Sequence, residues 1–101
     1  MSYSERVYSL CRKIPKGKVA TYKAIARALN SSPRAVGRAL RKNPYAPEVP
    51  CHRVIKSDGN IGGFKGSLDN QEKINLLIKE GVEIRNNKIS PNLFLKLQWE
   101  L

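Results

Sequence analysis

The residues best able to do covalent chemistry are a cysteine and a histidine that stand side by side. The stretch VPCHRVI, residues 49 to 55, places Cys51 directly before His52, the chain's single histidine. A thiolate rather than a thiol is the nucleophile, and a nearby imidazole can take the thiol proton. Adjacent side chains rarely face each other on a strand or a helix. We therefore expect His52 to act on Cys51 through a bridging water or within a sharp turn.

An imidazole that serves as a base needs a third group to fix its tautomer, preferably a carboxylate. Only eight Asp and Glu residues are available. Glu80, near the end of an expected helix, is a candidate, and a surface acid is the alternative. Cys11 lies in an apolar helical stripe, which indicates a small buried hydrophobe. Two cysteines and one histidine are too few ligands at this spacing for zinc, so no metal site is expected.

The charge balance indicates a polyanionic partner. Lysine and arginine number 19 against 8 acids, a net charge of +11, which favours nucleic acid over a membrane surface. There is no long apolar run and no signal-peptide pattern, so neither a membrane span nor secretion is expected. The expected location is the cytoplasm, or the nucleus in a eukaryote, where cysteines remain reduced. A length of 101 residues fits one domain, residues 1–101.

Three helices are predicted ahead of the Cys-His pair. Ser2 and Glu5 have capping-box spacing, and apolar residues then recur at helical spacing until Pro15 ends the first helix. Thr21 can cap a second helix. Ser32 can cap a third, with Pro33 at its first position. A helix, a short polar turn and a slim second helix form the outline of a helix-turn-helix. The apolar stripe of the first helix consists of Val7, Leu10, Cys11 and Ile14.

The third helix, PRAVGRALRKN, has the pattern of a DNA-reading helix. Its arginines Arg34, Arg38 and Arg41 are spaced i, i+4, i+7 and share a face. Small residues would let the backbone approach a duplex closely; these are Ala35, Gly37 and Ala39. Contacts of this kind to phosphates give affinity but little sequence choice. The alternative is an ordinary solvated basic face.

Beyond Asn43-Pro44 the expected elements are short. RVIK and NIGGF could form a wing-like hairpin around Asp58-Gly59, a strong turn dipeptide. A helix over 69–80 follows, which Gly81 ends. The tail VEIRNNKIS indicates two short strands around Asn86-Asn87, before a last helix from Ser90-Pro91 with Leu93, Leu97 and Trp99. The inner stripe of the 69–80 helix is predicted to be Ile74, Leu77 and Ile78. The predicted fold is mainly α, a winged helix-turn-helix-like DNA-binding domain with a small β-wing.

A family resemblance rests on several motifs in one order. PCHRVI is preceded by VATYKAIA and RAVGRALRKNP and followed by GNIGGFKGSL and KEG. Together they resemble the C-terminal active-site domain of the O6-alkylguanine-DNA alkyltransferases, also called methylated-DNA–protein-cysteine methyltransferases. The resemblance covers about residues 4–84 and leaves 85–101 as a tail; the family's usual N-terminal domain is expected to be absent. The related alkyltransferase-like proteins place tryptophan or another residue at the position of Cys51 and bind lesions without repairing them.

The resemblance implies direct-reversal DNA repair by a single-turnover methyltransferase. Cys51 would accept an alkyl group irreversibly from O6 of a flipped guanine, with no cofactor or metal. His52 would be the water-mediated base, oriented by Glu80. The partner would be double-stranded DNA containing O6-alkylguanine, bound by a monomer. An alkyl group inside a duplex is out of a side chain's reach, so the base must leave the stack.

The resemblance also implies roles in substrate and DNA binding. Tyr22 would help to rotate the target nucleotide and offer its hydroxyl to the base, and Arg34 would hold the gap that the base leaves. Asn43 would brace the turn before the cysteine loop. Val54 would line the pocket, its carbonyl facing the guanine amino group. The segment GGFKG would close the other side, with Phe64 where many members carry tyrosine and Lys65 where serine is frequent. DNA contacts are expected at Tyr22, Arg34, Ala35, Arg38 and Arg41.

Two other functions fit parts of the sequence. One is a lesion-sensing alkyltransferase-like protein that binds without transfer, although Cys51 argues against it. The other is a winged-helix transcription regulator with an idle cysteine, which would prefer a DNA sequence over a modified base. For single residues, Tyr22 could be a partly buried aromatic and Asn43-Pro44 a simple helix stop. The glycines at 62, 63 and 66 could mark a loop without a ligand.

Overall fold

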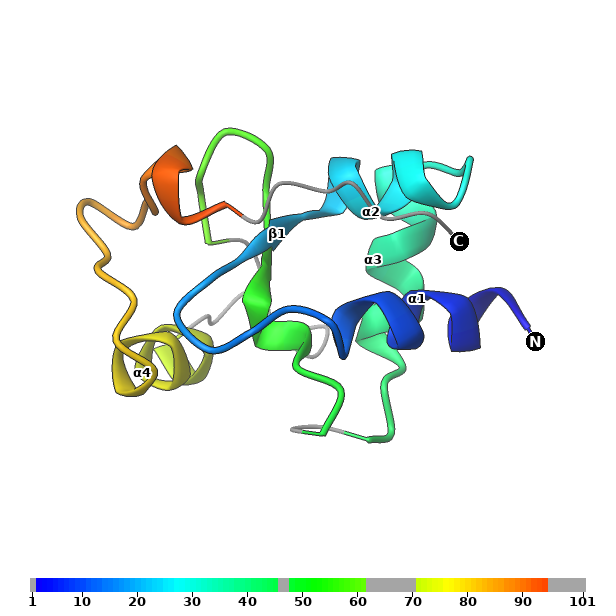
Figure 1. Ribbon diagram of the computed structural model, residues 1–101, viewed down its shortest axis with the longest axis horizontal. Coiled ribbons are helices and arrows are strands. Elements are labelled where there is room, and N and C mark those ends of the chain that lie inside the picture. The colour runs from blue at the N-terminus through cyan, green and yellow to red at the C-terminus, as the bar shows by residue number, and fades with distance from the viewer. Residues whose placement is uncertain (1, 46–47, 62–70, 95–101) are drawn as a thin grey trace.

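The computed structural model describes residues 2–45, 48–61 and 71–94, in which helices surround a very small sheet (Figure 1). The sheet stands between helices α1 to α3 on one side and α4 on the other. The sequence predicted a mainly α, winged helix-turn-helix-like domain with a small β-wing, and the helical architecture with a two-stranded sheet confirms this fold class. In chain order the elements are α1 (Tyr3–Cys11), β1 (Ala20–Thr21), α2 (Tyr22–Ala28), α3 (Pro33–Arg41), the 3-10 helix η1 (Cys51–Arg53), β2 (Val54–Ile55), α4 (Gln71–Lys79) and the 3-10 helix η2 (Pro91–Leu93).

All three predicted N-caps are confirmed. The Ser2 hydroxyl accepts from the Glu5 amide at 3.2 Å, and Thr21 Oγ1 accepts from the amide three residues on at 3.0 Å. Ser32 accepts at 3.2 Å from the third residue of α3, with Pro33 in the first turn. Each hydroxyl satisfies an amide that has no partner within its helix, so these three starts are specified by local sequence.

Helix α1 ends earlier than predicted. It stops at Cys11, and the chain continues through turns in which the amides of Lys13 and Ile14 donate to carbonyls three residues back, each at 3.0 Å. The residue before a proline is sterically disfavoured in the α conformation, so the helix unwinds before Pro15 rather than at it. The apolar stripe survives this change because Ile14 remains buried.

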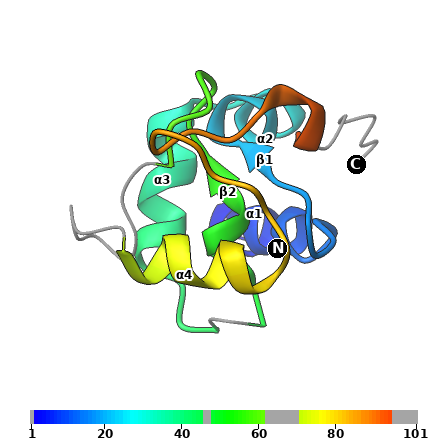
Figure 2. The ribbon, with the colours of Figure 1, turned by 90° about the vertical axis from the view of Figure 1, so that its left-hand side faces the viewer.

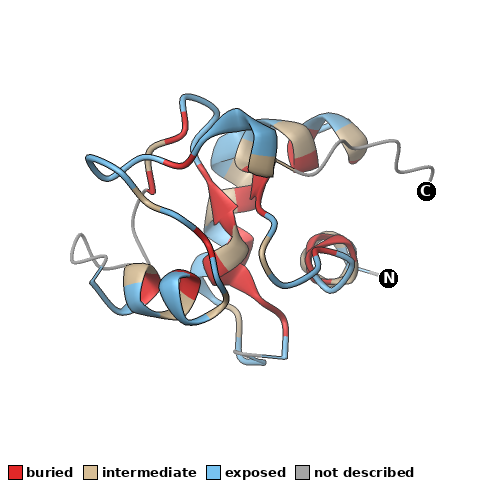
Figure 3. Cartoon of the chain, turned by 60° about the vertical axis from the view of Figure 1, so that its left-hand side comes forward, coloured by how far each residue is buried: buried red, intermediate tan, exposed pale blue. Residues whose placement is uncertain are grey.

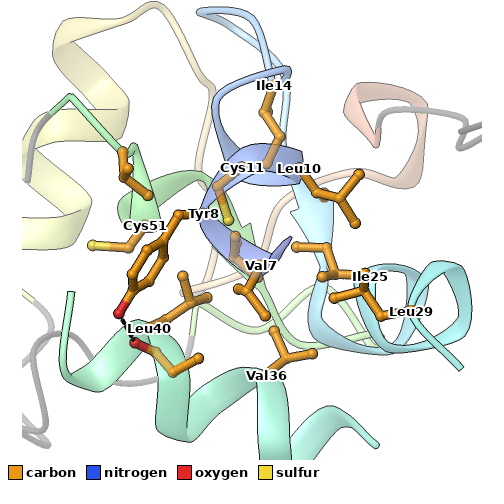
Figure 4. Packing of buried hydrophobic residues seen from close by; sticks show 14 of the residues in the cluster. Val7, Tyr8, Leu10, Cys11, Ile14, Ile25, Leu29, Val36, Leu40 and Cys51 are labelled. Atoms are coloured by element: carbon orange, nitrogen blue, oxygen red, sulfur yellow. Dashed lines mark hydrogen bonds between the residues drawn. The ribbon is translucent and has the colours of Figure 1, made fainter. Parts of the chain in front are cut away.

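The core is divided into two apolar clusters. The first joins the inner faces of α1, α2 and α3 and includes Cys51 (Figure 4). The second lies under α4 and the tail. β1, η1 and β2 run through the buried centre between them (Figure 3). The second cluster consists of Val19, Ile55, Ile61, Leu77, Val82 and Ile89. The residues of β1, η1 and β2 are therefore packed against an apolar cluster on each side.

The sheet pairs β1 with β2 in parallel, with Ala20 opposite Val54 and Thr21 opposite Ile55. The predicted turn at Asp58-Gly59 is present, because the Lys56 amide donates to the Asn60 carbonyl at 2.9 Å. Its flanks, however, pair elsewhere: β2 with β1, and Asn60 with Lys88 of the tail. Both residues of β2 are fully buried, which suits a strand covered on both faces rather than a hairpin exposed to solvent.

Helix α4 corrects one predicted stripe. Leu77 is fully buried and Ile74 partly buried, as predicted, but Ile78 is 57% exposed. The prediction for Ile78 was wrong because the inward face is centred on Lys73 and Leu77, which are one turn apart. A lysine at an inward position is invisible to a search for apolar periodicity. The helix is described from Gln71, so the start predicted at 69 lies outside the described residues.

The tail crosses back over the second cluster. Asn86 and Asn87 have φ of 51° and 64°, and Arg85 and Lys88 exchange backbone hydrogen bonds of 2.9 Å, which confirms the predicted tight turn. The pairing stops there, so the two predicted strands are reduced to isolated bridges. The 3-10 helix η2 begins after Ser90, and the Val19 amide donates to the Leu93 carbonyl at 3.1 Å. Leu97 and Trp99 lie outside the described residues.

Candidate active site

Cys51 is the first residue of η1, directly after the loop that leaves α3. Its amide donates to the Val49 carbonyl at 2.8 Å, and the Arg53 amide donates to the Pro50 carbonyl at 2.9 Å, which closes a sharp turn. The side chain is a free thiol, 6% exposed. The sequence predicted that a Cys-His pair could cooperate only through water or within such a turn, and a 3-10 turn is what the chain forms.

His52 points to the carboxylate that the sequence singled out. Its Nε2 lies 3.1 Å from Oε1 of Glu80, across 28 residues of sequence. Nε2 is buried and does not meet hydrogen-bond geometry with any described group, so the ring or the carboxylate needs a small rotation to close this contact. Burial lowers the pKa of His52, and the neighbouring Glu80 acts in the opposite direction. The imidazole is therefore held in the neutral form, which can accept a proton.

Glu80 is held in turn by Arg53, a residue to which the sequence reading gave no role. The Arg53 guanidinium donates to both carboxylate oxygens, at 2.9 Å from Nε and 2.5 Å from Nη2. Its Nη1 donates to the Ile14 carbonyl at 2.7 Å. Burial disfavours the charged carboxylate, but the two hydrogen bonds from Arg53 and the nearby His52 ring together hold the pKa of Glu80 below its usual range. Glu80 is therefore an anion that links η1 to the end of α4.

Tyr22 opens α2 and is partly buried against the first cluster. Burial, followed by the charges of Cys51 and Cys11, raises the pKa of Tyr22 to about 12. The phenol therefore keeps its proton at neutral pH and remains a hydrogen-bond donor. Tyr22 packs against the apolar cluster that includes Cys51.

Cys11 has the buried position predicted for it. It is fully inaccessible, and burial raises the pKa of its thiol to about 12, with the nearby Cys51 charge acting in the same direction. A thiol of this kind stays protonated at neutral pH. Of the two cysteines, only Cys51 precedes a histidine, and that histidine lies beside a carboxylate.

Asn43 braces the loop between α3 and η1. Its Nδ2 donates to the Val49 carbonyl at 3.0 Å, and its Oδ1 accepts from the Tyr45 amide at 2.9 Å. Asn43 therefore holds the loop two residues before Cys51, in addition to following the last turn of α3. Tyr8 of α1 donates its hydroxyl to the Ala39 carbonyl at 2.8 Å, which fixes α3 against the same region (Figure 4).

The basic face predicted for α3 is exposed. Arg34, Arg38 and Arg41 all face solvent, and Ala35 and Gly37 are half-buried between them. A Cβ added at Gly37 would meet no atom within 4 Å, so this part of the helix surface is open. Ala39 differs from the prediction: it is buried and packs inward, so it does not contribute to the slim outer face.

Val54 lies directly after η1 and is fully buried. Its carbonyl accepts a hydrogen bond of 2.6 Å from Nζ of Lys73. No role for Lys73 is predicted from the sequence. A positively charged residue at a position spaced by one turn from a buried leucine is the signal that could have revealed it. Phe64, Lys65 and the glycines around them lie outside the described residues.

No three metal-ligating side chains come together in the part of the chain that the structure describes. Within the same ranges, none of the helices is both long enough and apolar enough to cross a bilayer.

Comparison with known proteins connects this geometry to one family. The model of the family described as "6-O-methylguanine DNA methyltransferase, DNA binding domain" matches residues 2–82. The methylated-DNA–protein-cysteine methyltransferase of Sulfolobus acidocaldarius is 48% identical over 83 residues, which cover 82% of this chain and 52% of that protein. The chain spans about half the length of the curated relatives that it matches.

Two solved structures differ in how much of them the chain covers. The O6-methylguanine-DNA methyltransferase of Pyrococcus kodakaraensis strain KOD1 has a TM-score of 0.72 and 44% identity, over 81% of this chain and 47% of that one. The S. pombe protein Atl1, in complex with damaged DNA containing O6-carboxymethylguanine, has a TM-score of 0.83 and 35% identity. This second match covers 93% of the chain and 94% of Atl1.

Proposed function

The chain belongs to the family of the 6-O-methylguanine DNA methyltransferase DNA-binding domain, and from that premise we propose that it repairs DNA by transferring an alkyl group from O6 of guanine to Cys51. The observation that carries the proposal is a pair of neighbouring groups: His52 next to Cys51, and Glu80 next to His52. A neutral His52 follows the cysteine in a tight turn, and the anionic Glu80 stands 3.1 Å from its ring. This combination supplies a base and the group that orients it.

The reaction begins with removal of the thiol proton. His52 takes the proton of Cys51 through a water molecule, and Glu80 stabilises the imidazolium that forms. The thiolate attacks the alkyl carbon, a sulfur–carbon bond forms, and the bond from that carbon to O6 breaks. The electron pair of the broken bond remains with guanine, which takes up a proton at its ring nitrogen N1, and the protonated His52 returns its proton to water. The product is a thioether that water does not cleave, so each chain reacts once.

Access to the alkyl group requires that the nucleotide leave the duplex. Arg34, at the exposed start of α3, holds the gap, while Tyr22 assists the rotation and donates its protonated hydroxyl to the base. Arg38 and Arg41 contact phosphates, and the small Ala35 lets the helix approach closely.

The pocket walls complete the assignment. Val54 lines the pocket directly after η1, and Asn43 holds the loop that presents Cys51. Phe64 and Lys65 are proposed for the opposite side, as an aromatic wall and a backbone donor. The substrate is double-stranded DNA with an O6-alkylguanine, and the protein acts as a monomer without a cofactor, in the cytoplasm or the nucleus.

A second candidate function is lesion sensing without transfer. It is favoured by one observation: Atl1 matches 93% of this chain with a TM-score of 0.83, whereas the Pyrococcus kodakaraensis methyltransferase matches 81% with a TM-score of 0.72. A sensor would bind the flipped base and leave it alkylated.

Single-turnover titration separates the two functions. The protein is mixed with an excess of duplex that carries one O6-methylguanine, and unmodified guanine is counted by nucleoside analysis. We expect one guanine restored for each protein chain and none with Cys51→Ser. Lesion-selective binding with no guanine restored would overturn alkyl transfer and support sensing. No guanine restored, together with equal affinity for damaged and intact duplex, would overturn both.

A further inference from the structure

Tyr45 is an exposed aromatic residue that the proposed reaction does not use. It follows α3 in the loop that leads to Cys51, and Figure 2 shows this loop running below α4 before the chain returns to β2. The residue is 41% exposed, but its ring is held. It meets the ring of Tyr8 edge to face, with the ring centres 5.8 Å apart and an angle of 83° between the planes. Because the Tyr8 hydroxyl donates to the Ala39 carbonyl, this contact attaches the loop to both α1 and α3.

Arg12 contacts the same loop at two places. Its guanidinium lies over the Tyr45 ring, with the central carbon 5.8 Å from the ring centre. Its Nη2 lies 3.6 Å from Oε1 of Glu48. A guanidinium is attracted by the negative face of an aromatic ring, and its charge also attracts a carboxylate. Arg12 is the C-cap of α1, so these contacts fasten the loop to the end of that helix. We call Arg12, Tyr45 and Glu48 the loop clamp.

A short series of hydrogen bonds connects the loop clamp to Cys51. The carbonyl of Tyr45 accepts from the Val49 amide at 3.1 Å, and the Val49 carbonyl accepts from the Cys51 amide at 2.8 Å. Asn43 also donates to the Val49 carbonyl, so this carbonyl is held by two donors. A displacement of Tyr45 would therefore move the backbone that presents the thiol.

The loop clamp contributes little to the stability of the whole fold. The side chains of Arg12 and Glu48 are 40% and 74% exposed, and ion pairs between exposed groups are weak because water and salt screen them. A local segment can loosen at a much lower cost than unfolding of the whole protein. The chemistry is more sensitive, since a misplacement of about 1 Å can slow a reaction about a hundredfold. Loss of the clamp should therefore slow a reaction at Cys51 in a protein that remains folded.

We propose that Arg12 and Tyr45 are positioning residues for alkyl transfer: they hold the loop ahead of η1 against α1, and so keep the sulfur of Cys51 in line with the bond that joins the alkyl carbon to O6. The inference rests on the proposed function in taking Cys51 as the alkyl acceptor. Both residues act through the hydrogen bonds of Val49 and not on the reacting atoms. The role accounts for a cation and an aromatic ring that are kept together on an exposed loop.

Four substitutions test the loop clamp. Arg12→Met removes the charge but keeps an unbranched side chain, and Tyr45→Ala removes the ring. Tyr45→Phe keeps the ring without the hydroxyl, so it should restore what Tyr45→Ala loses. Lys13→Met removes the exposed lysine next to Arg12 and is the matched control for the loss of one positive charge.

The first test measures transfer from a saturating duplex that carries one O6-methylguanine. We expect the rate to fall about tenfold in Arg12→Met and Tyr45→Ala, to recover in Tyr45→Phe and to stay at the parent value in Lys13→Met. The dissociation constant for the duplex in Arg12→Met should equal that in Lys13→Met, because a positioning residue acts on the chemical step. Parent rates in Arg12→Met and Tyr45→Ala would overturn the proposal, and so would a fall in rate that only follows the fraction of unfolded protein in circular dichroism.

The second test uses the protein without DNA. Iodoacetamide needs access to the thiol rather than one direction of attack, and Cys51 is only 6% exposed. We expect Cys51 to be alkylated roughly threefold faster in Arg12→Met and Tyr45→Ala, because the loosened loop exposes the thiol. Peptide mass follows the reaction, with Cys51→Ser as the blank. An unchanged or slower reaction would overturn the proposal. If the parent transfers nothing from DNA and both variants still react faster with iodoacetamide, alkyl transfer fails as the function and the role of the clamp in holding Cys51 stands.

Discussion

The helix pair α2–α3 and the turn η1, which carries Cys51, are specified in different ways. Each helix of the pair begins at its own hydroxyl cap, Thr21 or Ser32, three residues from the amide that it satisfies. The turn η1 depends on partners far away in the sequence. His52 and Arg53 meet Glu80, which lies 27 residues beyond Arg53, and Arg53 also reaches back 39 residues to a carbonyl at Ile14.

The two regions also differ in burial and charge. The arginines of α3 face solvent, where each contributes to a long-range field that salt can screen. The charges around Cys51 are largely enclosed, so each depends on its own partner. Substitutions in α3 should therefore change DNA affinity by small, separable steps. Substitutions around η1 should change the chemistry, or the stability of the fold, by large ones.

The largest effect on the chemistry is expected at Glu80. Glu80→Gln keeps the shape of the side chain but removes the negative charge that stabilises a protonated His52. We expect the transfer rate from O6-methylguanine DNA to fall roughly a hundredfold, the scale of a lost acid–base partner. Quenched-flow measurement at saturating duplex gives the rate. An unchanged rate would show that the contact between Glu80 and His52 has no part in the reaction.

Arg53→Met breaks the ion pair between Arg53 and Glu80 but leaves the Glu80 carboxylate beside His52. Its loss should lower the free energy of unfolding by about 3 kcal/mol, because a largely buried Glu80 loses its bidentate partner. Urea denaturation measures this change. At a temperature where both variants are folded, the transfer rate of Arg53→Met should exceed that of Glu80→Gln. The reverse order would assign Arg53, not Glu80, to the reaction.

In the helix pair, Arg38→Ala should weaken binding to damaged and intact duplex alike. The expected loss is about tenfold near 0.1 M salt, with the slope of log affinity against log salt reduced by about one. Fluorescence anisotropy across a salt series measures both quantities. The rate at which iodoacetamide alkylates Cys51 in the protein without DNA should not change. A slower reaction of Cys51 in this variant would mean that the two regions are coupled in the free protein.

The smallest effect is expected from a helix cap. Ser32→Ala removes the hydroxyl that accepts a hydrogen bond from the Ala35 amide in α3. The free energy of unfolding should fall by about 1 kcal/mol. The transfer rate at saturating duplex should remain that of the parent, because α3 still packs through Val36 and Leu40. A large loss of rate would indicate that the start of α3 positions the lesion directly.

The same contrast explains which features the sequence could predict. Caps, the turn at Asp58-Gly59 and the αL turn at Asn86-Asn87 depend on neighbours within a few residues, so their residue types identify them. The partner of β2 could not be read in this way, because β1 lies more than thirty residues earlier and parallel pairing leaves no turn signature.

The candidate site was predicted in part. Cys51, His52 and Glu80 were named from chemistry and from family resemblance, and the structure brings His52 and Glu80 within 3.1 Å. Arg53 and Lys73 received no role, because a charged residue in a sequence is normally assigned to the surface. Only the three-dimensional arrangement reveals that both are enclosed by the partners that require them.

The central claim is that Cys51 is an acceptor and that the buried network around it serves this purpose. The most direct measurement is tandem mass spectrometry of peptides after incubation with a duplex that carries one O6-methylguanine. The account predicts one added methyl group, on the peptide that contains Cys51 and not on the peptide that contains Cys11. A methyl group on Cys11, or an unmodified protein that still binds the damaged duplex selectively, would contradict it.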